Sequence, residues 1–259
     1  MSKLHLLIPT ILLLCLSSCT PPDSVSELLV AFRNAQNGQL GEALFRSELC
    51  LRSNSDDVNA LLLNSYCIFT TASESSQKAK ALFNLDRTTR ITPESFTAWY
   101  FYGWALCENQ QYREALPVLE KALELLPPGS KKKGNILLLL GRCSSRNNLQ
   151  EKGLRYLQPL RVHAPYNDWP EVYNSLGILA LNRTDYRGAE RAFKQALERE
   201  RANPTVLQNL AVTYDLYLNN LAKAKATYIQ CLLALGNKQH LDTRLKIQNR
   251  LRQLSARKN

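Results

Sequence analysis

The fold of this chain is decided by residues Trp99–Pro127, which read WYFYGWALCENQQYREALPVLEKALELLP. Apolar side chains recur there at steps of three and four, a spacing that places them on one face of each of two helices. These side chains belong to Trp99, Tyr102, Leu106, Leu119 and Ala122. Asn109–Gln111 supplies a polar turn between the helices, and Pro127 ends the second one. Gly103 and Ala115 have almost no side chain, so the helices can approach closely where they cross.

The order of these residues resembles the tetratricopeptide repeat, a helix–turn–helix unit of about 34 residues. The residues that match the family in type and spacing are Trp99, Gly103, Ala115, Ala122 and Pro127. Tyr102, Leu106 and Leu119 each replace one large apolar residue with another. A hairpin of this kind cannot bury its apolar face alone and needs stacked neighbours. The resemblance therefore implies an all-α fold, a right-handed α-solenoid of stacked helix hairpins.

The same pattern recurs along the chain and predicts a solenoid over residues 24–238 with about six hairpins. Their expected ranges are 24–57, 58–95, 96–129, 134–167, 170–203 and 204–238. The fifth is nearly as regular as the third, whereas the first is degenerate and the second has a long polar turn. We expect residues 239–259 to form a capping helix and a basic tail, because the open end of a solenoid needs a helix with a polar outer face.

The first residues are typical of a targeting segment. Lys3 precedes a mostly apolar stretch, Leu4–Leu16, which is too short to span a bilayer and fits a signal peptide. Leu16–Cys19 then resembles the bacterial lipoprotein signal. That resemblance implies a signal peptide of residues 1–18 and diacylglyceryl modification of Cys19. The alternative is ordinary signal cleavage that leaves Cys19 as a thiol.

An acylated Cys19 would anchor the chain to a membrane through residues 19–23, a short tether stiffened by two prolines. In the lipoprotein family an aspartate directly after the cysteine favours the inner membrane. Thr20 stands at that position here, so the resemblance favours the outer membrane, with the repeats in the periplasm.

Cysteine usage agrees with an oxidising compartment without requiring disulfides. Once Cys15 leaves with the signal and Cys19 is acylated, an odd number of thiols remains, so at least one is free. The remaining thiols are those of Cys50, Cys67, Cys107, Cys143 and Cys231. Cys50 and Cys231 stand where other repeats have alanine, which predicts small buried residues. For Cys107 and Cys143, on adjacent first helices, we predict partnerless thiols, with a bridge between them as the alternative.

Charge and motif content argue against several function classes. The formal net charge is +11, which favours acidic partners or surfaces. The basic residues are dispersed and the signal directs the chain out of the cytosol, so we expect no nucleic-acid partner. Only His163 and His240 remain after signal removal, and no zinc, phosphate-loop or serine-nucleophile motif occurs. We therefore expect no enzyme activity, no cofactor, no metal site and no small-molecule substrate.

The repeat resemblance also implies a surface for partners. In this family the first helices of the hairpins line a concave groove that binds extended peptides or partner helices. The groove-facing candidates here are Phe32, Tyr66, Tyr100, Trp104, Arg142, Asn174 and Gln208. Large aromatic residues and arginine dominate binding hot spots, so Trp104 is the first functional candidate, with Trp99 assigned to structure. The alternative is that several of these residues, Tyr66 and Trp104 among them, pack between repeats.

These features lead to a functional hypothesis. The chain is expected to be a lipid-anchored scaffold or adaptor that binds protein or peptide partners in the bacterial cell envelope. Its layout resembles that of lipoproteins that help assemble the type IV pilus secretin, which implies a role in assembling an envelope, pilus or secretion complex. The alternative is a peripheral factor that binds anionic lipid or polymer through its basic C-terminal helix, and salt would weaken that binding steeply.

Overall fold

The structure is a computed structural model that describes residues 22–72, 74–236 and 241–256. Throughout these ranges the regular structure is helical, and they contain no strand. The predicted signal peptide and Cys19 lie outside the described residues, as do His240 and the last residues of the basic tail. Among the helices described, none is both long and apolar enough to cross a bilayer.

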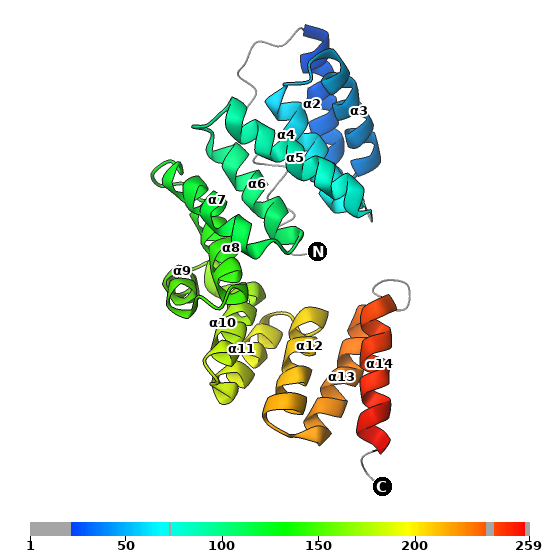
Figure 1. The fold of residues 1–259 in the computed structure, drawn as a ribbon, viewed down its shortest axis with the longest axis vertical. Coiled ribbons are helices and arrows are strands. Elements are labelled where there is room, and N and C mark those ends of the chain that lie inside the picture. The colour runs from blue at the N-terminus through cyan, green and yellow to red at the C-terminus, as the bar shows by residue number, and fades with distance from the viewer. Residues whose placement is uncertain (1–21, 73, 237–240, 257–259) are drawn as a thin grey trace. The chain divides into compact units, whose positions relative to one another are not determined.

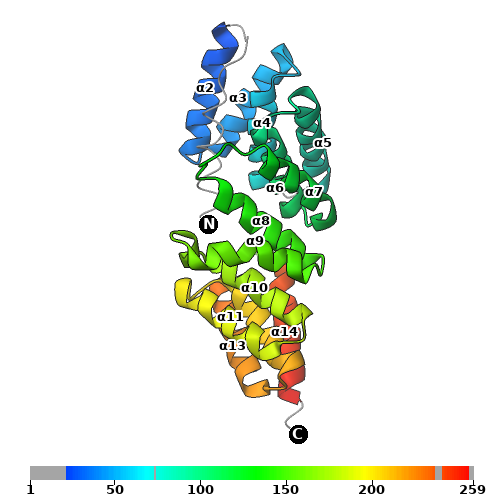
Figure 2. The same ribbon diagram turned by 90° about the vertical axis from the view of Figure 1, so that its left-hand side faces the viewer.

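The chain divides into two compact units, with the boundary between Cys143 and Ser144. The helices of the first unit are α2 (Pro22–Gln36), α3 (Leu40–Ser53), α4 (Val58–Thr71), α5 (Ser75–Ile91), α6 (Phe96–Glu108), α7 (Tyr112–Glu124) and the larger part of α8 (Lys133–Arg146). They pack as the hairpins α2–α3, α4–α5 and α6–α7 (Figure 1, Figure 2). Because proline fits the first turn of a helix, α2 begins at Pro22, inside the tether predicted for residues 19–23.

The second unit starts with the end of α8 and continues to the end of the chain. Its further helices are α9 (Gln150–Val162), the 3₁₀ turn η2 (Tyr166–Asp168), α10 (Pro170–Asn182), α11 (Tyr186–Arg199), α12 (Pro204–Val212), the π-helical turn η3 (Thr213–Tyr217), α13 (Leu221–Leu235) and α14 (Leu241–Ala256). In chain order α8 and α9 stand where the fourth hairpin is predicted, and the described helices follow the predicted order of elements, ending with a terminal helix. The predicted all-α solenoid fold is confirmed.

Several helices begin at a side chain that accepts a hydrogen bond from the backbone three residues further on. These N-cap residues are Asp57, Ser95, Asp185, Asn203 and Asn220. A cap of this kind satisfies one of the backbone N–H groups that the first turn of a helix leaves without a partner. Short polar residues therefore mark where the helices begin, and they are visible in the sequence.

The turns inside five of the hairpins use one residue in the left-handed region of backbone space. These residues are Gly38, Gln110, Asn148, Thr184 and Asn219, with φ between 48° and 78°. Glycine and asparagine adopt this conformation readily, whereas a β-branched residue such as Thr184 does so at a cost. The hairpin geometry therefore imposes the turn even where the local residue disfavours it.

Glycine on the first helix lets the two helices of a hairpin approach closely. A methyl group added at Gly103 would lie 2.5 Å from Cδ2 of Leu119 on the partner helix. One added at Gly177 would lie 2.6 Å from Cδ1 and 2.8 Å from Cζ of the Phe193 ring. All three distances are shorter than contacts of real Cβ atoms, so the larger residue on α7 or α11 occupies space that only glycine leaves open.

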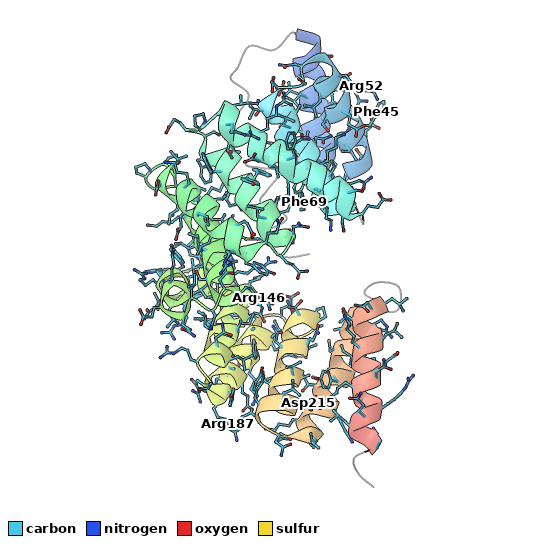
Figure 3. The ribbon with its side chains drawn as sticks, in the orientation of Figure 1. Phe45, Arg52, Phe69, Arg146, Arg187 and Asp215 are labelled. Carbon is cyan, nitrogen blue, oxygen red and sulfur yellow. The ribbon has the colours of Figure 1, made fainter. Side chains whose placement is uncertain are left out.

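The terminal helix α14 docks on the sixth hairpin through apolar and ionic contacts. Ile247 and Leu254 are buried. Arg250 donates two hydrogen bonds, each 2.7 Å, to the two oxygens of Asp215 in η3, which Figure 3 labels. The Tyr228 hydroxyl donates to the same carboxylate at 3.2 Å. Since the Asp215 side chain is only 1% exposed, these contacts supply the charge that its burial requires.

We predict that Gly177→Ala destabilises the protein by about 1–3 kcal/mol, because the rigid Phe193 ring cannot yield to the added methyl group. The matched control is Gly41→Ala on α3, where the added methyl group meets nothing within 4 Å. Thermal unfolding followed by circular dichroism should show a lower midpoint for the first variant, by about 2–4 °C per kcal/mol. The control should match or slightly exceed the parent. Equal midpoints for both variants would contradict the packing account.

Candidate functional site

The structure buries the aromatic residues that the sequence assigns to the groove. Phe32, Tyr66, Tyr100 and Trp104 are each at most 4% exposed. A side chain at that exposure has almost no surface to offer a partner, so the prediction that these four line an open groove is corrected. Their large rings fill the space between neighbouring helices instead, which was the alternative interpretation for Tyr66 and Trp104.

Trp104 lies at the centre of an aromatic cluster in the first unit. Its ring centroid is 5.8 Å from those of Tyr66 and Phe69 on α4, and 6.2 Å from that of Phe101. These are distances at which aromatic rings pack favourably in tilted or edge-on arrangements. Trp99 remains partly exposed, and its indole Nε1 donates to the Pro93 carbonyl at 2.7 Å. Trp104 is thus a core residue, and Trp99, which the sequence assigns to structure, is the more exposed of the two tryptophans.

The polar groove candidates keep part of their surface. Arg142, in the first unit, is 33% exposed and donates to Glu108 at 2.9 Å. Asn174 on α10 is half-buried and accepts a hydrogen bond from Asn209 at 2.8 Å. Gln208 on α12 is also half-buried. Partner contact by these three residues stays a prediction, and the structure leaves each of them partly accessible.

The cysteines of the described residues are buried, and none forms a disulfide. Cys107 and Cys143 bring their Sγ atoms within 2.8 Å of each other, and burial raises the pKa of the Cys107 thiol. Cys50 and Cys231 are buried small residues, as the sequence predicts. Across the ranges that the structure describes, no three histidine, cysteine, aspartate or glutamate side chains gather as metal ligands would.

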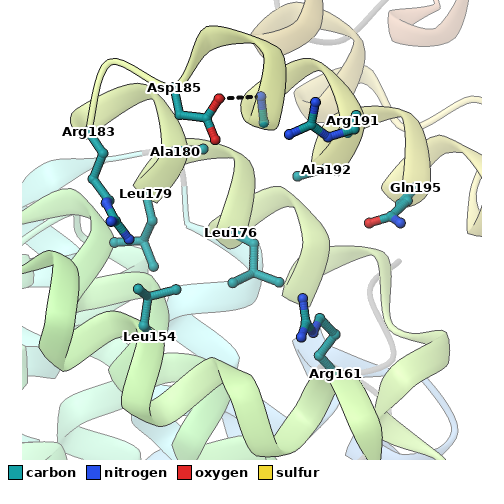
Figure 4. Close-up of a pocket in the computed structure, with 11 residues that line it drawn as sticks. Leu154, Arg161, Leu176, Leu179, Ala180, Arg183, Asp185, Arg191, Ala192 and Gln195 are labelled. Carbon is teal, nitrogen blue, oxygen red and sulfur yellow. Dashed lines mark hydrogen bonds between the residues drawn. The ribbon is translucent and has the colours of Figure 1, made fainter.

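The second unit contains a pocket of about 510 Å³ between α9, α10 and α11 (Figure 4). We call it the arginine pocket because Arg161, Arg183 and Arg191 surround it. Its other lining residues are Leu154, Leu176, Leu179, Ala180, Asp185, Gly188, Ala192 and Gln195. Leucine and alanine side chains thus form an apolar floor, while the three guanidinium groups come from α9, the α10–α11 turn and α11.

The guanidinium groups of the arginine pocket have no hydrogen bond or ion pair with any residue that the structure describes. The one acidic residue in the lining is Asp185, whose Oδ1 accepts a hydrogen bond from the Gly188 backbone N–H at 2.7 Å. The repeat pattern did not predict this site, because the groove candidates it provides all lie on first helices. Arg183, Arg187 and Arg191 follow one another at intervals of four residues, and this basic pattern is the sequence signal that could have indicated the site.

A buried carboxylate next to this region is, in contrast, fully satisfied. Glu190 is 6% exposed and accepts hydrogen bonds from Lys194 at 2.8 Å, Arg187 at 3.0 Å and the Tyr214 hydroxyl at 3.0 Å. The Lys223 ammonium lies 3.7 Å away. Hydrogen bonds from Lys194 first, and then from Arg187 and Tyr214, lower the pKa of Glu190 to about 2 against the opposing effect of burial. This cluster links α11 to η3.

Comparison with protein families matches residues 96–128 to the tetratricopeptide repeat. Residues 96–128 form a tetratricopeptide repeat. The match covers α6 and α7, the hairpin whose sequence carries the clearest repeat pattern. A comparison with curated protein sequences finds no significant match.

Solved structures share the fold at low sequence identity. PilW, described as a widely conserved type IV pilus biogenesis factor, has a TM-score of 0.68 and 19% identity over 87% of this chain and 100% of its own. A chain of the APC/C hetero-tetramer Cut9–Hcn1 has a TM-score of 0.67 and 15% identity over 97% of this chain and 46% of its own. A tetratricopeptide repeat protein from Parabacteroides merdae has a TM-score of 0.64 and 15% identity over 92% and 90%. These likenesses establish the fold.

The Glu190 cluster predicts a specific dependence of stability on pH. The pKa of Glu190 in the folded state is depressed from 4.5 to about 2. The ionised carboxylate therefore stabilises the fold above pH 4.5, and this contribution is lost as the pH falls towards 2. We expect Glu190→Gln to lower the unfolding midpoint at neutral pH and to converge with the parent at the acid end. Glu198→Gln, at a side chain 71% exposed, is the control and should follow the parent throughout. Parallel curves for Glu190→Gln and the parent would contradict the assignment.

Proposed function

We propose that this chain is a lipid-anchored scaffold or adaptor that binds protein partners in the bacterial cell envelope. The observation that carries the proposal is the tetratricopeptide repeat at 96–128 within a chain built from helix hairpins. Such repeats bind peptide or protein partners through a groove, and they are generally not enzymes. We propose the same for this chain, with proteins or peptides as partners and without nucleic-acid or small-molecule substrates.

The anchor is proposed from the sequence of the first residues. An apolar stretch followed by Leu16–Cys19 resembles a lipoprotein signal, and acylation of Cys19 would add two or three acyl chains. Each buried methylene group contributes about 0.8 kcal/mol, so more than one chain makes membrane attachment stable. Helix α2 begins at Pro22, so an anchor at Cys19 would hold the first hairpin close to the membrane surface. With Thr20 after the cysteine, we propose the periplasmic face of the outer membrane.

The place of this scaffold in the envelope is proposed from a likeness of fold. PilW is described as a type IV pilus biogenesis factor, and its whole chain superposes on most of this one. We propose that this protein likewise supports the assembly of an envelope, pilus or secretion complex. Partner contact is assigned to Arg142 in the first unit, and to Asn174 and Gln208 in the second, because these groove candidates retain exposed surface.

The alternative role, anionic lipid or polymer binding through α14, finds less support. Arg250 is held by Asp215, and Arg244 donates to the Leu232 carbonyl at 2.8 Å. Lys246 pairs with Asp242 at 2.7 Å on the same helix. These basic side chains serve the docking and local stability of α14, which leaves the helix fewer free charges than its sequence indicates.

We expect Cys19→Ala to abolish incorporation of an alkyne-tagged fatty acid and to remove the protein from the membrane fraction, because the acylated residue is gone. Metabolic labelling followed by fractionation measures both effects. Cys15→Ala, inside the predicted signal peptide, is the matched control and should be labelled and fractionated like the parent. A Cys19→Ala protein that still partitions with the membrane, or a parent that takes up no label, would refute the anchor.

Scaffolding by the second unit is tested at its half-buried polar residues. The double variant Asn174→Arg, Gln208→Arg should lose partners in affinity purification from detergent-solubilised envelopes, because two long charged side chains would occupy the proposed contact surface. The control is Gln158→Arg with Gln230→Arg, two exposed positions on second helices that add the same charge. Partner sets read by mass spectrometry should differ only for the first double variant. An unchanged partner set for Asn174→Arg, Gln208→Arg would contradict the contact assignment.

A further inference from the structure

We propose that the arginine pocket of the second unit binds an acidic segment of a partner protein, in which carboxylates flank an apolar side chain. The inference rests on the proposed function of the chain as a protein-binding scaffold and names the chemistry of one class of partner. It concerns a surface between the second helices α9 and α11, with α10 as its floor, and none of the groove candidates lines it.

The net positive charge of the pocket favours an anionic ligand. Arg161, Arg183 and Arg191 bring three positive charges and Asp185 one negative charge, which leaves a net charge of +2 in the lining. The Asp185 carboxylate caps α11 through the Gly188 N–H and forms no ion pair with the arginines. Like charges around one hollow repel each other, so a bound carboxylate gains from all of them at once.

Other arginines of the second unit form ion pairs with buried carboxylates. Arg187, one turn after Arg183, pairs with the buried Glu190, and Arg250 pairs with the buried Asp215. The guanidinium groups of the arginine pocket have no such carboxylate among the described residues. Their planar groups keep all their donors for a ligand, and arginine binds carboxylates through two parallel hydrogen bonds.

The floor of the pocket selects a ligand with an apolar part. Leu154 and Leu176 are partly exposed inside the pocket, and Leu179 lies beneath them at 1% exposure. A bare inorganic anion would leave these leucines uncovered, and a flat layer of lipid headgroups does not enter a hollow of about 510 Å³. A peptide that carries a leucine-like side chain between two acidic ones satisfies both the floor and the rim.

The geometry fits a segment that crosses the pocket. Figure 4 shows Arg183 on one side of the leucine floor and Arg161 and Gln195 on the other, with Arg191 above it. Arg161 comes from α9 and Arg191 from α11, so separate elements present the charges around the floor. Successive acidic side chains of one extended peptide can therefore reach different arginines.

The proposal is tested with the full-length chain in detergent and a set of fluorescein-labelled peptides in which two glutamates flank a leucine at varied spacing. Fluorescence anisotropy should show saturable binding of at least one spacing. For the same peptide with glutamine in place of glutamate, the affinity should fall by about tenfold or more, since charge-assisted hydrogen bonds are lost. Absence of saturable binding for every spacing would overturn the proposal.

Substitution separates the pocket from general electrostatics. Arg161→Gln with Arg191→Gln should weaken peptide binding by about tenfold or more. Arg155→Gln with Arg201→Gln removes the same charge at exposed sites outside the pocket and should change binding by less than about twofold, the scale of distant, screened charges. Both double variants should unfold like the parent, because these side chains have no partner in the described structure. Equal weakening by the two double variants would overturn the site.

Two further outcomes have defined meanings. If vesicles of anionic phospholipid bind the parent and this binding is lost only in the pocket variant, while peptides do not bind, the site recognises lipid and the proposal is wrong. If the pocket variant loses peptide binding but retrieves the same envelope partners, the pocket stands as an acidic-peptide site and those partners use another surface. Loss of envelope partners in Asn174→Arg, Gln208→Arg with no peptide binding to the parent supports the scaffold and refutes the pocket.

Discussion

The structure depends on the close approach of two helices within each hairpin. At Gly103 and Gly177 the first helix has no side chain, and Leu119 or Phe193 of the second helix fills the space. Glycine also allows a close approach between neighbouring hairpins, because a methyl group added at Gly153 on α9 would lie 3.0 Å from the Leu179 side chain on α10. Helices that approach this closely exclude water from the seam between them, and each seam becomes a floor on which the next hairpin can stack.

Stacking explains why Tyr66 and Trp104 on the first helices α4 and α6 are unavailable to partners. When α6 packs on α4, the rings of Tyr66, Phe69 and Trp104 meet at contact distance. Tyr66 and Trp104 are thereby buried, while Phe69 stays partly exposed. A large ring on a first helix gains more from this burial than from exposure, since burying an aromatic side chain removes a large apolar area from water. The residues left on the surface to contact partners are then polar ones, such as Arg142, and those of the arginine pocket between α9 and α11.

Charges in the second unit act in two different ways. Glu190 and Asp215 are buried carboxylates surrounded by basic groups and tyrosine hydroxyls, and they join α11, η3, α13 and α14. Removing one partner from such a site leaves a charge buried without compensation, which costs several kcal/mol. Exposed pairs such as Lys246–Asp242 contribute little. The arginines of the pocket belong to neither class, because they converge on one hollow without a carboxylate partner among the described residues.

The amino-acid sequence by itself determined the hairpin architecture, since Gly103, Gly177 and the polar turns act over distances of one repeat. It also placed the buried Cys50 and Cys231, because alanine occupies the same position in neighbouring repeats. Only the tertiary structure decided which side chains remain on the surface. Exposure depends on how adjacent hairpins cover one another, so Trp104 became core, and Arg161, distant in sequence from Arg191, came to share a pocket with it. Helical periodicity reports which face a residue occupies, but the neighbouring helix decides whether that face meets water.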